Sequence, residues 1–176
     1  HLSDFDGLVS SPLALLAAID RKSHADAGPV TTQFCDGYTS TTFHHGLILH
    51  RLEEDGPALI TKDANNVVVE QMYWLDGALH RQDGPAKIAF SPIDGSTTVE
   101  YWRHGCQRRA DGPATIVFDA DGVSQFEMWW RAGAGLHRQD GPAVTYGKST
   151  DAWQRHEFWV DGIFLRAAEN GVEVAS

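Results

Sequence analysis

The chain has 176 residues, of which 42% are hydrophobic and 22% charged, and this ordinary globular usage excludes a disordered or fibrous class. Its formal net charge of −10 disfavours direct binding to nucleic acid or to an anionic membrane, and it favours a partner with a basic surface. Seventeen glycines and six tryptophans, beside only two methionines, favour a turn-rich β protein over a helix bundle.

The two cysteines, Cys35 and Cys106, have neither the spacing of a metal site nor that of a disulfide framework. This usage predicts a reducing, cytoplasmic location. No apolar stretch approaches the roughly 18 residues that a membrane span requires. The sequence therefore predicts a protein without a membrane partner.

The first predicted element is a short helix in the N-terminal segment, residues 1–29. Ser11 and Pro12 suit the N-cap and first position of a helix that runs to about Lys22. Leucine and isoleucine between positions 13 and 19 form an apolar stripe along it. We expect this helix to cap the first unit of the repeat that follows, because a stack of units otherwise exposes an apolar end.

A repeat occupies residues 30–171. Gly-Pro pairs recur at intervals of 28, 28, 28 and 29 residues. They are Gly28-Pro29, Gly56-Pro57, Gly84-Pro85, Gly112-Pro113 and Gly141-Pro142. A fixed period of this length predicts about five copies of one supersecondary unit, stacked as a solenoid or array in a single domain.

Other positions keep the same period. A glycine stands three residues after an aromatic residue in every copy, in the pairs Phe43 and Gly46, Trp74 and Gly77, Trp102 and Gly105, Trp130 and Gly133, and Trp159 and Gly162. An arginine follows each of these turns, at positions 51, 81, 109, 138 and 166. An aspartate precedes each Gly-Pro pair from position 55 onward, as at Asp83.

Inside a unit the pattern is that of short antiparallel strands. Apolar residues alternate over 86–90 and 114–118, which places Ala, Ile and Phe on one face. Pairs such as Asp94-Gly95 and Asp76-Gly77 accept the positive φ of tight hairpin turns. We expect an all-β fold, a twisted elongated sheet or solenoid with two to three strands per unit, and a tail over 172–176.

The segment from Tyr73-Trp74-Leu75-Asp76-Gly77 to His80-Arg81-Gln82-Asp83-Gly84-Pro85-Ala86 resembles the MORN-type repeats. The likeness spans roughly residues 30 to 171. It implies hairpins that stack into an elongated twisted sheet, and an interaction scaffold without chemistry of its own. The units here are longer than in that family, because they carry the His-Arg and Asp-Gly-Pro-Ala segment.

Motifs that suggest chemistry have structural explanations. The His-Arg-x-Asp segment repeats, whereas a catalytic site is needed once, so we expect the arginine and aspartate to form a buried or half-buried pair that fixes each corner. Asp119-Ala120-Asp121-Gly122 begins like a calcium loop, but Trp130 stands where the bidentate glutamate belongs. His44 and His45 alone do not make a metal site. We expect no metal, no cofactor and no enzymatic activity.

A second aromatic column is the candidate binding site. Its members immediately precede the tryptophans of units two to five, so they point to the opposite face of the sheet. They are Tyr73, Tyr101, Trp129 and Phe158. The column is either covered by turns or a helix, or exposed as an aromatic strip of the kind on which protein hot spots are built.

The function favoured by these features is a rigid, acidic protein-protein interaction module. One specific form is an inhibitor of phage or mobile-element type that blocks a basic site of a nucleic-acid-handling enzyme. The alternatives are a binder of glycans or small ligands through the aromatic face, and an enzyme with a His-based site in one divergent unit. The oligomeric state stays open, because the edges of such a sheet can pair with another copy.

Overall fold

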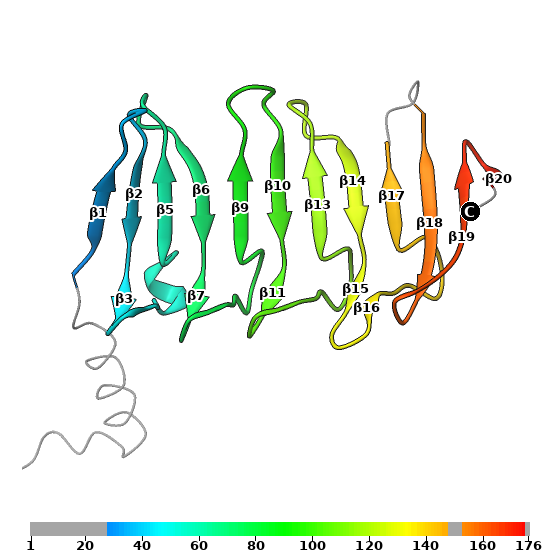
Figure 1. The fold of residues 1–176 in the computed structure, drawn as a ribbon, viewed down its shortest axis with the longest axis horizontal. Helices are drawn as coiled ribbons and strands as arrows, with labels where there is room; N and C mark the ends of the chain where they lie inside the picture. The colour runs from blue at the N-terminus through cyan, green and yellow to red at the C-terminus, as the bar shows by residue number, and fades with distance from the viewer. Residues whose placement is uncertain (1–27, 148–152, 175–176) are drawn as a thin grey trace, which may run out of the picture.

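The computed structural model describes residues 28–147 and 153–174. The helix predicted over residues 11–22 lies outside these described residues. What the structure describes is all-β, as predicted, and its main feature is one open antiparallel sheet of twelve strands (Figure 1). No helix in the described ranges is long and apolar enough to cross a membrane.

The twelve strands of the main sheet lie side by side in chain order, because consecutive strands are joined either by a hairpin turn or by a short excursion that includes a small two-stranded hairpin. They are β1 (Val30–Gln33), β2 (Thr39–Thr42), β5 (Leu59–Lys62), β6 (Val68–Met72), β9 (Lys87–Phe90), β10 (Thr97–Glu100), β13 (Thr115–Phe118), β14 (Ser124–Met128), β17 (Val144–Tyr146), β18 (Arg155–Val160), β19 (Ile163–Glu169) and β20 (Val172–Val174).

Four small hairpins line one long edge of this sheet, at the bottom of Figure 1. They pair β3 (His44–His45) with β4 (Ile48–Leu49), β7 (Trp74–Leu75) with β8 (Ala78–Leu79), β11 (Trp102–Arg103) with β12 (Cys106–Gln107), and β15 (Trp130–Arg131) with β16 (Gly135–Leu136). We call these four pairs the mini-hairpins. A 3-10 turn, η1 (Glu53–Asp55), follows the first of them.

Each structural unit begins at a ring, continues through a mini-hairpin and a Gly-Pro corner, and ends with two long strands. Units 1 to 5 span residues 43–72, 73–100, 101–128, 129–157 and 158–174. In unit 5 the mini-hairpin is continuous with β18 and β19. These two strands pair from Arg155 with Glu169 to Val160 with Ile163, with a bulge between Phe158 and Trp159. The full units thus have four strands each, two long and two short, whereas the sequence predicted two to three.

A row of alanines forms the tightest part of the core. Ala58, Ala86, Ala114 and Ala143 follow the Gly-Pro pairs and are completely buried. Each one accepts a hydrogen bond from the ring residue before its mini-hairpin, as Tyr73 N donates to Ala86 O, and donates to the next long strand. These side chains are fully enclosed, so a larger one would have to displace its neighbours.

The mini-hairpin turns follow the sequence prediction. Asp76 and Gly77 have φ values of 49° and 76°, and a two-residue hairpin turn of type I′ needs positive φ at both of its residues. His104-Gly105 and Asp161-Gly162 repeat the pattern. A further pair, Asn170-Gly171, turns the chain from β19 into β20, so residues 172–174 add a strand at the sheet edge where the sequence suggested a tail.

Candidate functional site

Every unit contains a stack of an arginine on an aromatic ring. The guanidinium carbon lies between 3.6 and 4.2 Å from the ring centroid in all five units, close enough for a cation–π contact. The pairs are Arg51 on Phe43, Arg81 on Tyr73, Arg109 on Tyr101, Arg138 on Trp129, and Arg166 on Phe158. The repeated arginine is therefore bound to the ring that begins its own unit.

These stacks place the four residues of the predicted binding column. Tyr73, Tyr101, Trp129 and Phe158 are all half-buried, and each has one face covered by its arginine. The covering group is neither a turn nor a helix, the two covers that the sequence suggested. The face that the arginine covers is not available for stacking on a sugar or on a partner's side chain.

Phe43 belongs to this stacked column, whereas the glycine spacing had aligned it with the tryptophans. Phe43 N donates to Ala58 O and Tyr73 N donates to Ala86 O, so the two rings occupy equivalent positions. His44 consequently stands where Trp74 stands in the next unit. Gly46, with φ 62°, stands in the first turn where Asp76 stands in the second. The glycine therefore comes one residue earlier in the first turn than in the second, and this shifted the apparent register of unit 1 by one residue.

The corners differ from the buried or half-buried Arg–Asp pairs expected from sequence. Arg109 and Arg138 do pair with Asp111 and Asp140, at 3.5 and 3.1 Å, but the two carboxylates are 86% exposed. The arginine instead gains its burial from the ring and, at Arg138, also donates to the carbonyl of Pro142. Exposed pairs of this kind add little stability compared with the stack itself.

The first corner is longer and reaches into the next unit. Glu53 accepts hydrogen bonds from the backbone N–H groups of Gln82 and Asp83, and from the Arg81 guanidinium at 3.3 Å. Partial burial raises the pKa of Glu53, but these three donors together hold it below its ordinary value. The carboxylate thus ties unit 1 to unit 2.

Neighbouring units are also joined along the mini-hairpin edge by a repeated set of three contacts. Between units 1 and 2, the Nδ1 atom of His50 lies 3.0 Å from Asp76 N, and Arg51 N donates to Trp74 O. The third contact runs from Gly77 N to Leu49 O. His50, which precedes the stacked Arg51, is therefore a structural ligand of the next unit's turn.

The same set recurs at two further interfaces. Between units 2 and 3, His104 N donates to Nδ1 of His80, and between units 4 and 5, Asp161 N donates to Nδ1 of His137. The two backbone contacts accompany the histidine in both places. They are Arg81 N to Trp102 O and Gly105 N to Leu79 O, then Arg138 N to Trp159 O and Gly162 N to Leu136 O.

The interface between units 3 and 4 breaks this pattern. Arg108 occupies the histidine position, and the fourth mini-hairpin is one residue longer, with nine steps from Trp129 to Arg138 instead of eight. None of the three contacts forms between these two units, both of which the structure describes in full apart from residues 148–152. The long strands continue through this point, since β10, β13, β14 and β17 are paired without a gap.

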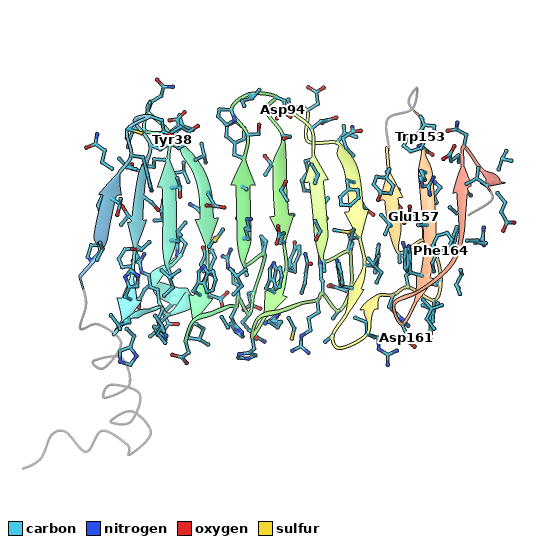
Figure 2. All side chains as sticks on the ribbon, in the orientation of Figure 1. Tyr38, Asp94, Trp153, Glu157, Asp161 and Phe164 are labelled. Carbon is cyan, nitrogen blue, oxygen red and sulfur yellow. The ribbon has the colours of Figure 1, made fainter. Side chains whose placement is uncertain are left out.

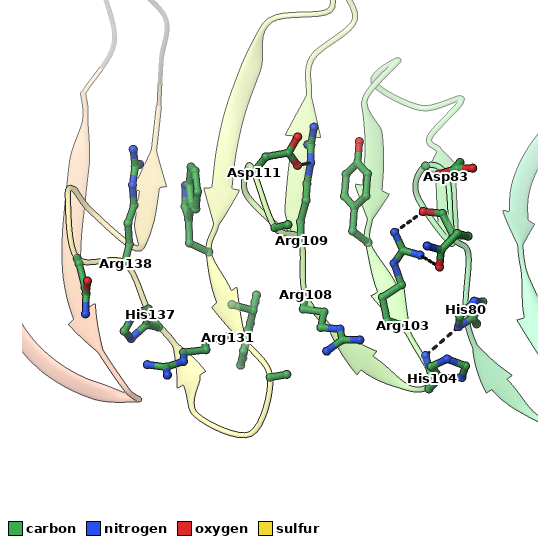
Figure 3. A pocket seen from close by; sticks show the side chains of 18 of the residues that line it. His80, Asp83, Arg103, His104, Arg108, Arg109, Asp111, Arg131, His137 and Arg138 are labelled. Carbon is green, nitrogen blue, oxygen red and sulfur yellow. Dashed lines mark hydrogen bonds and ion pairs between the residues drawn. The ribbon is translucent and has the colours of Figure 1, made fainter.

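A groove of about 1310 Å³ opens at this irregular interface (Figure 3). Its lining comes from the mini-hairpins and corners of units 2 to 4. The charged and imidazole side chains in it are Arg103, Arg108, Arg109, Arg131, Arg138, Asp83, Asp111, Asp140, His80, His104 and His137. Tyr101 and Trp129 of the predicted binding column also line the groove, whereas Tyr73 and Phe158 do not.

Three of the five arginines differ from the stacked ones. Arg103, Arg108 and Arg131 lie along one rim of the groove, with Arg108 in the middle (Figure 3). Arg103 donates to the side chain and the backbone carbonyl of Gln82, and Arg131 pairs with Asp161 at 2.9 Å. Arg108 is exposed, and its guanidinium makes no ion pair within residues 28–147 and 153–174.

The cations of the rim affect the nearest histidine. Burial, the adjacent His104 ring and the Arg103 guanidinium all lower the pKa of His80 below its ordinary value. The His80 and His104 rings lie 4.1 Å apart between centroids. His80 is therefore neutral at pH 7, which its role as a hydrogen-bond acceptor from His104 N requires.

The opposite long edge of the sheet carries negative charge. Asp36, Asp63, Asp94 and Asp119 stand in the four hairpin turns that join β1 to β2, β5 to β6, β9 to β10 and β13 to β14. Each accepts a hydrogen bond from a backbone N–H of its own turn. Figure 2 shows Asp94 on this edge and Asp161 on the mini-hairpin edge. The molecule is thus electrically asymmetric across its width.

No group of three or more His, Cys, Asp or Glu side chains suited to a metal ion occurs in the described part of the chain. No protein-family model matches the chain, and no curated protein matches it either.

Sequence reasoning did not find Arg103, Arg108 and Arg131. Two signals for them were visible, namely an arginine in a column of histidines and the single 29-residue interval among intervals of 28. Their meaning depended on the contacts between units, which no local pattern contains.

Proposed function

We propose that the protein is a non-enzymatic interaction module that binds another protein in the groove between units 3 and 4. The observation that carries this proposal is the coincidence of three features at one interface. The regular contacts are missing, the groove opens, and Arg108 has no ion-pair partner among the described residues. Features that vary against a repeated scaffold are where a repeat protein acquires a specific partner.

The repeated polar groups support a scaffold role more than a catalytic one. Nδ1 of His50, His80 and His137 is engaged by the next unit's turn, so it is not available as a base at that nitrogen. The stacked arginines are likewise engaged by rings and corners. The chemistry that a motif search would assign to the His-Arg-x-Asp segments is thus already used to join the units.

The two cysteines provide the test, because they lie at opposite edges of the sheet and both are exposed. Cys106 pairs with Arg103 in the third mini-hairpin, next to the groove, and Cys35 stands in the first hairpin turn. We would attach a bulky maleimide to Cys106 in a Cys35→Ser background, and to Cys35 in a Cys106→Ser background. The proteins captured from cell lysate by each form would then be compared by mass spectrometry.

The Cys106 adduct should lose the captured proteins that the unlabelled variant retains, and the Cys35 adduct should keep them. Equal capture by both adducts would contradict a groove-based function. The bulky label could itself disturb the mini-hairpin. Changing Arg103, Arg108 and Arg131 to alanine disables the groove without a label, and this variant should also lose the captured proteins.

A second candidate is supported by the acidic edge. Hydrogen bonds from the Ser96 backbone and from the hydroxyls of Ser91 and Ser96 lower the pKa of Asp94 to about 2, so it is ionised at any cellular pH. Ile93 beside it is 96% exposed, and Phe34 in the first turn is 47% exposed. Carboxylates interleaved with apolar side chains suit a partner with a basic surface. A nucleic-acid-handling enzyme has such a surface, so this edge fits the hypothesis of an inhibitor that blocks the basic site of an enzyme of that class.

The same labelling experiment separates the two candidates. If the acidic edge is the binding surface, the Cys35 adduct loses the partner and the Cys106 adduct keeps it. Capture that weakens with added salt is expected in both cases, so salt dependence does not discriminate between them.

A further inference from the structure

The groove is positively charged in a protein that is strongly negative. Five arginines face three carboxylates in its lining, so its formal charge is +2 with every histidine neutral, against −10 for the whole chain. The two stacked arginines are turned toward their rings. Asp161 pairs with Arg131 from outside the lining, so the charge that a ligand would meet comes mainly from Arg103 and Arg108, with a smaller part from Arg131.

These three guanidinium groups retain donors for a ligand. A guanidinium has five N–H groups arranged as a planar fork that matches a carboxylate. Arg131 uses Nη1 on Asp161, and Arg103 uses its two terminal nitrogens on Gln82, a neutral residue. Arg108 has no side-chain hydrogen bond within the described ranges, so its whole fork is available.

We propose that the occupant of the groove is an extended acidic segment of a partner protein, with carboxylates spaced along it to meet these three arginines. This inference rests on the proposed function, since it names the ligand of the same groove. Arg108 is the central anchor. Tyr101, Trp129 and Trp130 contribute half-buried ring surface to the lining, against which the uncharged residues between the carboxylates pack.

The pattern of charge favours a peptide over a nucleic acid. Asp83, Asp111 and Asp140 lie among the arginines of the lining, so a polymer with a charge on every residue meets repulsion at intervals. A peptide can place neutral residues opposite those carboxylates. A nucleic acid also approaches a chain of net charge −10 against long-range repulsion, and a short acidic segment carries far less charge.

The test measures fluorescence anisotropy of a labelled peptide, in which glutamate alternates with serine, on addition of the whole chain. The matched control peptide has glutamine at every glutamate. We expect saturable binding of the acidic peptide, and binding at least about tenfold weaker for the glutamine peptide, because the charge-assisted contacts are lost. Inorganic phosphate and a single-stranded oligonucleotide serve as competitors.

Variants locate the site. Arg108→Ala should weaken the acidic peptide about tenfold, and Arg108→Lys should restore only part of the affinity because an ammonium lacks the fork. Lys62→Ala removes the same charge at the other edge of the sheet, where Lys62 bonds Asn66, and should leave the affinity unchanged. Arg108 is exposed, so folding should be preserved, and circular dichroism of each variant checks this.

Four outcomes would overturn the inference. The first three are equal affinity for the acidic and glutamine peptides, equal weakening by Lys62→Ala and Arg108→Ala, and an oligonucleotide that displaces the peptide while binding more tightly. Displacement by millimolar phosphate alone would show a small-anion site and would also count against an extended segment. If the labelling experiment still locates the captured protein at the groove while the acidic peptide fails, the proposed function survives and only the ligand assignment falls.

Discussion

The interface between units 4 and 5 and the interface between units 3 and 4 share the same long-strand pairing but differ along the mini-hairpin edge. At the first, His137 and two backbone bonds join the units. At the second, Arg108 replaces the histidine, the turn has one more residue, the contacts are missing, and the groove lined by units 2 to 4 extends across the interface. The pairing of the long strands therefore keeps units 3 and 4 together although the hydrogen bonds between their mini-hairpins are missing. The mini-hairpins alone could not hold the two units together without those hydrogen bonds.

The two kinds of arginine show the same contrast. Arg138 stacks on Trp129, bonds the Pro142 carbonyl and has a side chain that is 25% exposed. Arg131, seven residues earlier, has a side chain that is 57% exposed and pairs with a carboxylate of the next unit. Arginine thus supports the fold where an aromatic ring lies beside it, as at Arg138. Where no ring in the described residues covers it, as at Arg131, it is a candidate for recognition of a partner.

The largest effect should come from removing a stacked arginine. Arg138→Ala eliminates a cation–π contact, a carbonyl hydrogen bond and the packing of a long side chain, and we expect it to lower the free energy of unfolding by about 2 kcal/mol. Urea unfolding followed by tryptophan fluorescence measures this. Arg131→Ala is the matched control and should cost less than about 0.5 kcal/mol. Equal losses would remove the distinction between the two kinds of arginine.

A smaller effect of opposite sign should follow from repairing the irregular interface. Arg108→His combined with deletion of Ala134 returns the third interface to the residue and turn length of the others. We expect the regular contacts to form and to raise the free energy of unfolding by about 1 kcal/mol, since each intramolecular hydrogen bond contributes modestly. The repaired variant should also lose acidic-peptide binding. A repaired protein that still binds the peptide would show that the groove does not depend on the irregularity.

The regular interface between units 2 and 3 should be sensitive to pH. Burial, His104 and Arg103 hold the pKa of His80 below its ordinary value of 6.5, so the unfolded chain binds that proton first as the pH falls. This contribution to stability is complete above pH 6.5 and is lost as the pH falls toward the folded-state pKa. Urea unfolding at several pH values between neutral and mildly acidic should show a shallower decline for His80→Gln than for the unchanged protein.

Identical pH profiles for the two proteins would contradict the assigned role of His80. Other groups also titrate as the pH falls, Glu53 among them, so the informative quantity is the difference between the variant and the unchanged chain at each pH. Glu53 faces the same corner and opposes part of the shift of His80.

The smallest effect on stability is expected at Arg108 itself. Arg108→Ala removes an exposed side chain that has no ion-pair partner in the described residues, and the free energy of unfolding should change by less than about 0.5 kcal/mol. Chemical denaturation is sufficient to check this. A loss as large as that of Arg138→Ala would mean that Arg108 supports the fold, and its assignment to recognition would then be wrong.

The sequence by itself determined the fold class and the unit. Periodic glycines, alternating apolar residues and Asp-Gly pairs act locally, so Asp76-Gly77 and the strands around it were predictable without knowledge of their neighbours. Only the tertiary structure decided where each repeated side chain is used. Phe43 joined the stacked rings, the arginine that recurs in every unit stacked on a ring, and the histidines bound the next unit, because these arrangements depend on contacts across a unit or between units. The one extra residue before Arg138 was visible in the chain, but its consequence, a basic groove in an acidic protein, arises only when units 3 and 4 are placed side by side.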